Sequence, residues 1–272
     1  IPSMNITLSG NQPTQAELDK LPDPLFGIDD EVVNSTKYDS RIQDIIDIAK
    51  EYKKPIMMRI GGEFNGWWNG YHPYEYPKAY QKIVQMFRDA GADNVAFIWC
   101  YEPAAPNDFD EKNVLGQYKW FPGNDYIDWY SIDLYATNDI SGAEKTANGT
   151  LTSYGKTLRF LDMAVKAQKP VIIAESGSAF VDITPGDADG KNDWDAWFKP
   201  YFNLIHTHPE IKWFHFVNYD WTKAGYYLAS GWKNSDITNN AYISSQYVNE
   251  LNKEQYLHSD ERYLLKNYLD YK

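Results

Sequence analysis

The sequence predicts an α/β protein built on a parallel sheet, and the (β/α)8 barrel (TIM barrel) is the favoured architecture. Short apolar runs alternate with segments of helical periodicity, which is typical of repeated βα units. Several runs are apolar throughout, as expected for strands buried on both faces. The 272 residues contain no linker, charge block or change in composition, and single α/β barrels routinely reach this length. We therefore expect residues 1–272 to form one barrel domain.

Six runs rich in β-branched and aromatic residues are predicted strands. In chain order they are Met4–Leu8, Pro55–Ile60, Asn94–Tyr101, Tyr126–Tyr135, Pro170–Glu175 and Lys212–Tyr219. A complete barrel of this class has eight strands, and the segment before Met4 is too short to supply two more. The sequence therefore predicts most of a barrel rather than a closed one.

Segments with apolar residues at helical spacing separate these strands. The predicted helices are Ser40–Tyr52, Pro77–Ala90, Tyr154–Ala167, Ala196–His206 and a last one from about Asp260 to Leu269. Two stretches rich in Pro, Gly and Asp, Pro103–Asp110 and Thr184–Asp193, are predicted to be loops that follow strands. Such loops carry the binding residues of a βα barrel.

Composition narrows the range of partners. A net charge of −12 argues against nucleic acid or an anionic membrane as the main partner. No apolar stretch approaches the roughly 18 residues of a membrane span, so membrane insertion is not expected. Aromatic residues make up 16% of the chain, and Tyr and Trp rings suit stacking on uncharged sugars, although core packing accounts for most of them. The chain begins at Ile1 without a signal peptide, so we expect a processed or cropped product.

Two carboxylates follow predicted strands, Glu63 and Glu175. An acid placed after a buried strand is costly unless it is paired or functional. The strand period of two puts Arg59 on one face with Glu63, and Ile173 on one face with Glu175. Two carboxylates that face each other across a cleft are typical of glycoside hydrolysis. The alternative is that each acid caps a helix or pairs with a nearby Lys or Arg.

Flat aromatic rings and hydroxyl-binding groups occur together at four strand ends. They are Trp99, Tyr101, Asp133, Tyr135, Asn218, Asp220 and Trp221. Rings of this kind stack on sugar C–H faces while Asn and Asp bind hydroxyls. The five His residues lack zinc-site spacing, and the Gly in Asp187–Asp193 comes too early for a calcium loop. No nucleotide-binding motif occurs, and we expect neither a metal nor a cofactor.

The run from Arg59 to Trp68, with Gly62-Glu63-Phe64-Asn65-Gly66 at its centre, resembles the acid/base strand of glycoside hydrolase family 26. This is the mannanase-containing family of the (β/α)8 retaining-glycosidase clan. The run from Lys169 to Ser178 looks like the nucleophile strand of that family. The stretches between them follow the family order, so that the resemblance covers most of Pro55–Trp221.

This resemblance implies that Glu63 is the general acid/base and that Glu175 is the nucleophile, on the fourth and seventh barrel strands. The first two strands would then be absent from this chain. The expected carboxyl separation is about 5–5.5 Å, the retaining geometry. The residues expected to contact substrate are Arg59, Asn65, Trp67, Trp68, Trp99, Tyr135, Asn218 and Trp221. Within this set Tyr135 would bond the nucleophile, and Trp221 would form the floor under the cleaved sugar.

The resemblance, together with these residues, predicts a retaining endo-β-glycosidase that is secreted or on the cell surface and monomeric. Its favoured substrate is the polysaccharide β-1,4-mannan. Gly62 stands where the family usually carries His, and glycine offers no side chain to bind the sugar 2-hydroxyl. Two alternatives stay open: the same chemistry on β-1,3-xylan or a β-glucan, and a catalytically silent barrel that binds carbohydrate.

Overall fold

The computed structural model of the protein describes residues 1–9, 26–109 and 119–258. The chain divides into two compact units. Unit 1 contains Ile1–Gly177 and Tyr201–Val217, and unit 2 contains Ser178–Pro200 and the chain from Asn218 onward. The central sheet belongs to unit 1.

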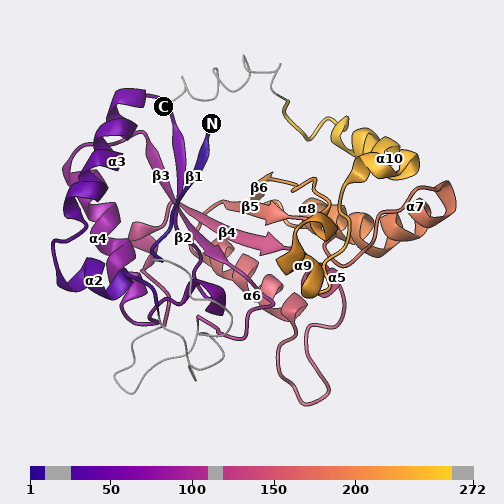
Figure 1. Ribbon diagram of the computed structural model, residues 1–272, viewed down its shortest axis with the longest axis horizontal. Coiled ribbons are helices and arrows are strands. Elements are labelled where there is room, and N and C mark those ends of the chain that lie inside the picture. Colours follow the sequence, from indigo (N-terminus) through magenta and orange to yellow (C-terminus); the bar gives the residue numbers. More distant parts are fainter. Residues whose placement is uncertain (10–25, 110–118, 259–272) are drawn as a thin grey trace. The chain divides into compact units, whose positions relative to one another are not determined.

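Six parallel strands form one sheet in sequence order (Figure 1). They are β1 Ser3–Ile6, β2 Ile56–Glu63, β3 Val95–Tyr101, β4 Trp129–Leu134, β5 Val171–Ser176 and β6 Ile211–Phe214. Each pairs only in parallel with its neighbours in the sequence, which is the strand order of a βα barrel. All six predicted strands are confirmed. Two of them are shorter than predicted: the fourth begins at Trp129 rather than at Tyr126, and the last ends at Phe214 rather than at Tyr219.

One face of this sheet has an apolar layer beneath a polar one. Met57, Ile98 and Ile172 form a buried cluster on β2, β3 and β5, against which Trp129 and Trp213 pack. Arg59 follows two residues after Met57 and lies opposite Ile98 in the β2–β3 register. Because side chains alternate along a strand, Arg59 continues the face of the apolar cluster toward the carboxyl ends of the strands.

Helices cover the sheet where the sequence predicts them. They are α3 Asp39–Tyr52, α4 Tyr76–Asp89, α6 Ser153–Lys166 and α8 Lys199–Thr207, with the short helices α2 Asp29–Asn34 and α5 Thr137–Ile140. Figure 1 shows α3 and α4 next to each other beside the strands. Helix α4 packs on β3 through Phe87 and Phe97, whose ring centroids are 5.3 Å apart. Helix α6 packs on the same strand through Phe160, which stacks 4.9 Å from Tyr101. The predicted helix at Asp260–Leu269 lies outside the described residues.

A bulge in β2 and a bulge in β5 determine toward which face of the sheet the following side chains point. In β2, Arg59 pairs with Ile98 and Glu63 pairs with Cys100, so that four residues of β2 advance against two residues of β3. Gly61 and Gly62 lie in this bulge and have φ of +83° and +56°. Glycine adopts such values without a steric penalty. On β5 the register advances from Ile173 to Glu175 while β4 advances by one residue. Glu175 therefore shares a face with Ile172, and the prediction that it shares one with Ile173 is wrong, because the bulge reverses the alternation.

Unit 2 contains several helices and helical turns. They are α7 Asp187–Asp193, a π-helical turn at Trp194–Phe198, α9 Gly225–Ala229 and α10 Ala241–Leu251. The prediction of a loop over Thr184–Asp193 is wrong from Asp187 onward, because these residues form α7, which continues directly into the turn that carries the buried Trp197. Asn240 caps α10, since its Oδ1 accepts from Ile243 N at 3.1 Å, and its Nδ2 donates to Thr184 O at 2.8 Å. No helix in the described ranges combines the length and apolar character required to cross a membrane.

Candidate active site

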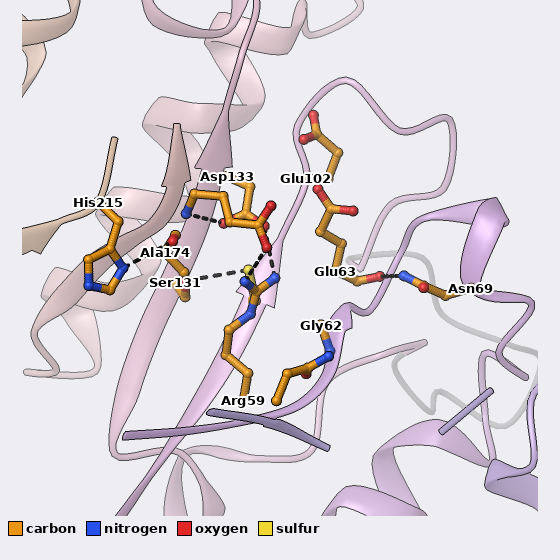
Figure 2. Close-up of polar contacts among 12 residues, drawn as sticks. Arg59, Gly62, Glu63, Asn69, Glu102, Ser131, Asp133, Ala174 and His215 are labelled. Atoms are coloured by element: carbon orange, nitrogen blue, oxygen red, sulfur yellow. Dashed lines mark hydrogen bonds and ion pairs between the residues drawn. The ribbon is translucent and has the colours of Figure 1, made fainter. Parts of the chain in front are cut away.

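A buried arginine organises the polar layer above the apolar cluster. Arg59 on β2 is 7% exposed. Its Nη1 donates to Glu175 Oε1 at 2.6 Å, and its Nη2 donates to Asp133 Oδ2 at 2.9 Å. Figure 2 shows the Arg59 guanidinium next to Asp133. Because buried charges are tolerated only when they are paired and hydrogen-bonded, this arrangement fixes side chains from β2, β4 and β5 relative to one another.

Of the two acids Glu63 and Glu175, Glu175 is the better solvated and the more strongly hydrogen-bonded. Tyr135 donates its hydroxyl to Oε2 at 2.7 Å, and Arg59 occupies Oε1. Partial burial alone would raise the pKa of Glu175, but the Arg59 charge and the hydrogen bonds from Tyr135 and Arg59 outweigh it and hold the pKa below its ordinary value. Glu175 is therefore a carboxylate at neutral pH, as a nucleophile must be.

Glu63, at the end of β2, has the opposite character. Burial, and next the charge of Glu175, raise its pKa to about 7 against the opposing effects of Arg59, Trp68 and Glu102. Trp68, in the 3-10 turn η1 Trp67–Asn69, donates Nε1 to Glu63 Oε2 at 2.7 Å. An acid with a pKa near 7 can both give and accept a proton at neutral pH. Two carboxyl groups whose pKa values are driven apart are typical of an acid/base and nucleophile pair.

Three further residues belong to this constellation. Asp133 was predicted only as a strand-end group that binds hydroxyls, Glu102 only as a substitute for Glu63, and His215 not at all. Asp133 is fully buried, and its Oδ1 accepts from Glu175 N at 2.9 Å. Glu102 is 5% exposed and hydrogen-bonded to Glu63. His215 lies beside β5, with Nδ1 3.1 Å from Ala174 O. An acid inside an apolar strand, as in Ile132-Asp133-Leu134, was the available signal for the first of these.

The family model described as glycosyl hydrolase family 26 matches residues 11–210. The chain belongs to glycosyl hydrolase family 26.

Among curated proteins, this family 26 chain is similar to "Beta-1,3-xylanase TXYA" of Vibrio sp, with 26% identity that covers 87% of this chain and 52% of the relative. A "Beta-1,3-xylanase" of Alcaligenes sp is 24% identical, over 86% of this chain and 50% of the relative. The chain thus spans about half the length of these relatives.

Solved structures of family 26 support the fold. A Cellulomonas fimi endo-beta-1,4-mannanase double mutant matches with a TM-score of 0.59 and 16% identity, over 95% of this chain and 55% of that chain. The catalytic domain of a Bacillus sp. JAMB-750 endo-beta-1,4-mannanase matches with a TM-score of 0.55 and 17% identity, over 95% of this chain and 67% of that chain. Together with the six parallel strands in sequence order, these likenesses confirm the predicted (β/α)8-barrel fold class.

Two residues expected to line the cleft of this family 26 chain lie in the core. Trp99 is fully buried, stacks 4.4 Å from Phe64, and donates Nε1 to Trp120 O at 3.1 Å. Asn65 is also fully buried, and its amide bonds the backbone of Glu102 and of Asn107. Packing explains Trp99 and loop anchoring explains Asn65, and neither side chain is exposed to solvent.

The tryptophan pair after Glu63 differs from Trp99 in exposure. Trp67 is 37% exposed, and Trp68 lies 5.9 Å from it, edge to face, while it bonds Glu63. Trp67 therefore has a free ring surface that a sugar could stack on.

Asn218 and Trp221 belong to unit 2. Asn218 accepts from Ile237 N at 2.8 Å and donates to Asp236 Oδ1 at 3.2 Å, so it anchors the turn at Ile237–Asn239. Trp221 packs 4.8 Å from Tyr227 and 4.8 Å from Trp232. Both residues thus have defined local partners within their own unit.

One acidic group among the described residues could hold a metal ion, formed by Asp29, Asp30 and His72 with ligand atoms within 4.8 Å of one another. The Asp29 carboxylate already accepts from His72 N at 2.8 Å and lies 2.9 Å from the His72 ring. This group therefore joins α2 to the segment that follows η1.

Proposed function

We propose that this chain is the catalytic domain of a retaining endo-β-glycosidase, with Glu175 as nucleophile and Glu63 as general acid/base. The observation that carries the proposal is the contrast between the two acids. Burial and the neighbouring charge of Glu175 raise the pKa of Glu63 to about 7, whereas Arg59 and Tyr135 overcome burial at Glu175 and lower its pKa. The contrast supplies one protonated and one ionised carboxyl group at neutral pH, which double displacement requires.

In the proposed reaction, Glu175 attacks the anomeric carbon while Glu63 protonates the leaving oxygen. A covalent glycosyl-enzyme forms, and Glu63 then removes a proton from water that attacks the same carbon, so that the configuration is retained. Tyr135 and Arg59 bond the two Glu175 oxygens and orient the carboxylate for attack.

Two β-glycans are candidate substrates of the proposed enzyme. The relatives named β-1,3-xylanases cover 87% and 86% of this chain, which favours β-1,3-xylan. This chain also has Gly62 at the position where the family usually carries histidine. The backbone N of Gly62 donates to Asn5 Oδ1 at 3.0 Å. β-1,4-Mannan is the second candidate, supported by the sequence resemblance. We further propose a secreted or cell-surface location and a monomeric protein.

A panel of β-glycans with product sizing tests this proposal. The wild type should release oligosaccharides from β-1,3-xylan or β-1,4-mannan, and NMR of early products should show the β-anomer. Glu63→Ala and Glu175→Ala should each lose at least about a hundredfold in kcat/KM, whereas Glu51→Gln, an exposed glutamate on α3, should keep wild-type activity. If both alanine variants hydrolyse like the wild type, the mechanism is wrong. If the wild type binds a polysaccharide but cleaves none, the chain is a carbohydrate-binding barrel instead.

A further inference from the structure

Glu102 is a buried acid next to the proposed acid/base. It directly follows β3, is 5% exposed, and forms a side-chain hydrogen bond with Glu63. Figure 2 shows the two glutamate side chains on the same side of the site. The mechanism proposed above assigns Glu102 no role.

Backbone and side-chain contacts hold Glu102 in place. Ala104 N donates to its Oε1 at 2.8 Å. Asn65 brackets its backbone, because Asn65 Oδ1 accepts from Glu102 N at 3.0 Å and Asn65 Nδ2 donates to Glu102 O at 2.7 Å. The loop after β2 and the loop after β3 are therefore joined at this residue, and its carboxyl group has a fixed orientation.

A hydrogen bond between two carboxyl groups requires a proton, since two carboxylates have no donor between them. The charged groups with the largest influence on Glu102 are Glu63 from β2, Asp139 from α5 and Asp133 from β4, and all three are acidic. In the described part of the chain, no Lys, Arg or His forms an ion pair with Glu102. Glu63, by contrast, feels the Arg59 charge and accepts from Trp68. The proton of the pair therefore belongs to Glu102, whose pKa burial and these neighbours raise.

We propose that Glu102 is a positioning residue that acts through Glu63: as a neutral acid, it donates a hydrogen bond to the Glu63 carboxyl group and favours its ionised form. This inference rests on the acid/base role proposed for Glu63. Glu102 and Trp68 would then donate to Glu63 together, and both bonds strengthen when Glu63 loses its proton to the leaving group. The pair holds Glu63 ready to accept a proton from water in the second step.

The pH dependence of kcat/KM in Glu102 variants tests the role, because its high-pH limb reports the loss of the Glu63 proton. Glu102→Ala removes the donor, so we expect the limb to move to higher pH by about one unit. Glu102→Gln keeps both a donor for Glu63 and an acceptor for Ala104 N, so the limb should stay within about 0.3 unit of the wild type. If Glu102 were ionised, both variants would remove a negative charge and move the limb to lower pH. If Glu102 only stabilised its loop, neither variant would move the limb; either result overturns the proposal.

Infrared spectroscopy gives a readout that needs no activity and no alanine variant. In a Glu63→Gln background at neutral pH, a protonated-carboxyl C=O band should be present and should vanish when Glu102→Gln is added. Absence of that difference means that Glu102 is ionised and overturns the proposal. Full activity of Glu63→Ala would instead overturn the acid/base assignment while the band still reports the Glu102 proton, so the two failures are distinguishable.

Discussion

Arg59 and Asp133 form a buried ion pair, with Nη2 and Oδ2 2.9 Å apart and side-chain exposures of 9% and 0%. Asp133 uses its other oxygen to accept from Glu175 N. The pair therefore connects the strand that carries the proposed acid/base to the backbone of the proposed nucleophile. A buried pair of this kind is weak evidence for net stability, but the loss of Asp133 leaves the buried Arg59 charge only partly compensated.

We expect Asp133→Asn to destabilise the protein by about 3–5 kcal/mol, because Arg59 would keep only Glu175 as a charged partner. Urea unfolding monitored by tryptophan fluorescence measures this change. Asp162→Asn is the matched control, since Asp162 pairs with Lys166 on the surface of α6, and it should cost less than about 1 kcal/mol. A loss of less than about 1 kcal/mol for Asp133→Asn would contradict the prediction.

The activity should follow a bell-shaped pH profile. Glu63 must be protonated to act as an acid, so kcat/KM should fall as the pH rises through about 7. Glu175 must be ionised to attack, so kcat/KM should fall only when the pH drops below 4.5, since its pKa is lowered from that value. Initial rates between about pH 3 and pH 9, a range that extends roughly two units above the Glu63 pKa and well below the ordinary pKa of Glu175, measure both limbs. A high-pH limb that persists unchanged in Glu63→Gln would show that another group causes it.

The hydrogen bond from Trp68 to Glu63 predicts a difference between two adjacent tryptophans. Trp68→Phe removes the Nε1 donor to Oε2, so the pKa of Glu63 should rise and the high-pH limb should move upward by about one unit. Trp67→Phe keeps an aromatic ring, and the Trp67 ring is not bonded to Glu63, so its high-pH limb should match the wild type. Equal shifts in the two variants would rule out the hydrogen bond as the cause.

The two glycines of the β2 bulge should differ in their tolerance of a methyl group. A Cβ at Gly61 would lie 2.6 Å from Tyr76 Cε2, whereas a Cβ at Gly62 would meet nothing closer than Arg59 Nη2 at 3.7 Å. Both have positive φ, so Gly62→Ala should cost about 1–2 kcal/mol from backbone strain alone, and Gly61→Ala should cost at least about 1 kcal/mol more. Urea unfolding of the two variants compares them directly. Equal losses would mean that Tyr76 moves away without cost.

The strands were predictable because each is a short run rich in β-branched and aromatic residues, and the positions of Arg59, Glu63 and Glu175 followed from those runs. The face of Glu175 was not predictable from alternation, because the β5 bulge depends on how Asp133 of β4 pairs with it. Residue type also failed to separate Trp67 from Trp99. Both are tryptophans near a strand end, but α6 and the residues around Phe109 cover only Trp99. The role of Glu102 depended on a contact between two loops that no local pattern encodes.

The raised pKa of Glu63 has a consequence for the charge of the site during turnover. In the reactive form before the reaction, Glu63 holds its proton and Glu175 is ionised, so the two acids together carry one negative charge. In the glycosyl-enzyme of the proposed mechanism, Glu175 is an ester and Glu63 is ionised, so the sum is unchanged. Because the Glu175 charge is one cause of the high Glu63 pKa, forming the ester lowers that pKa when Glu63 must give up its proton, and hydrolysis restores it. One negative charge thus passes from Glu175 to Glu63 and back in each cycle, and the two acids never carry a second.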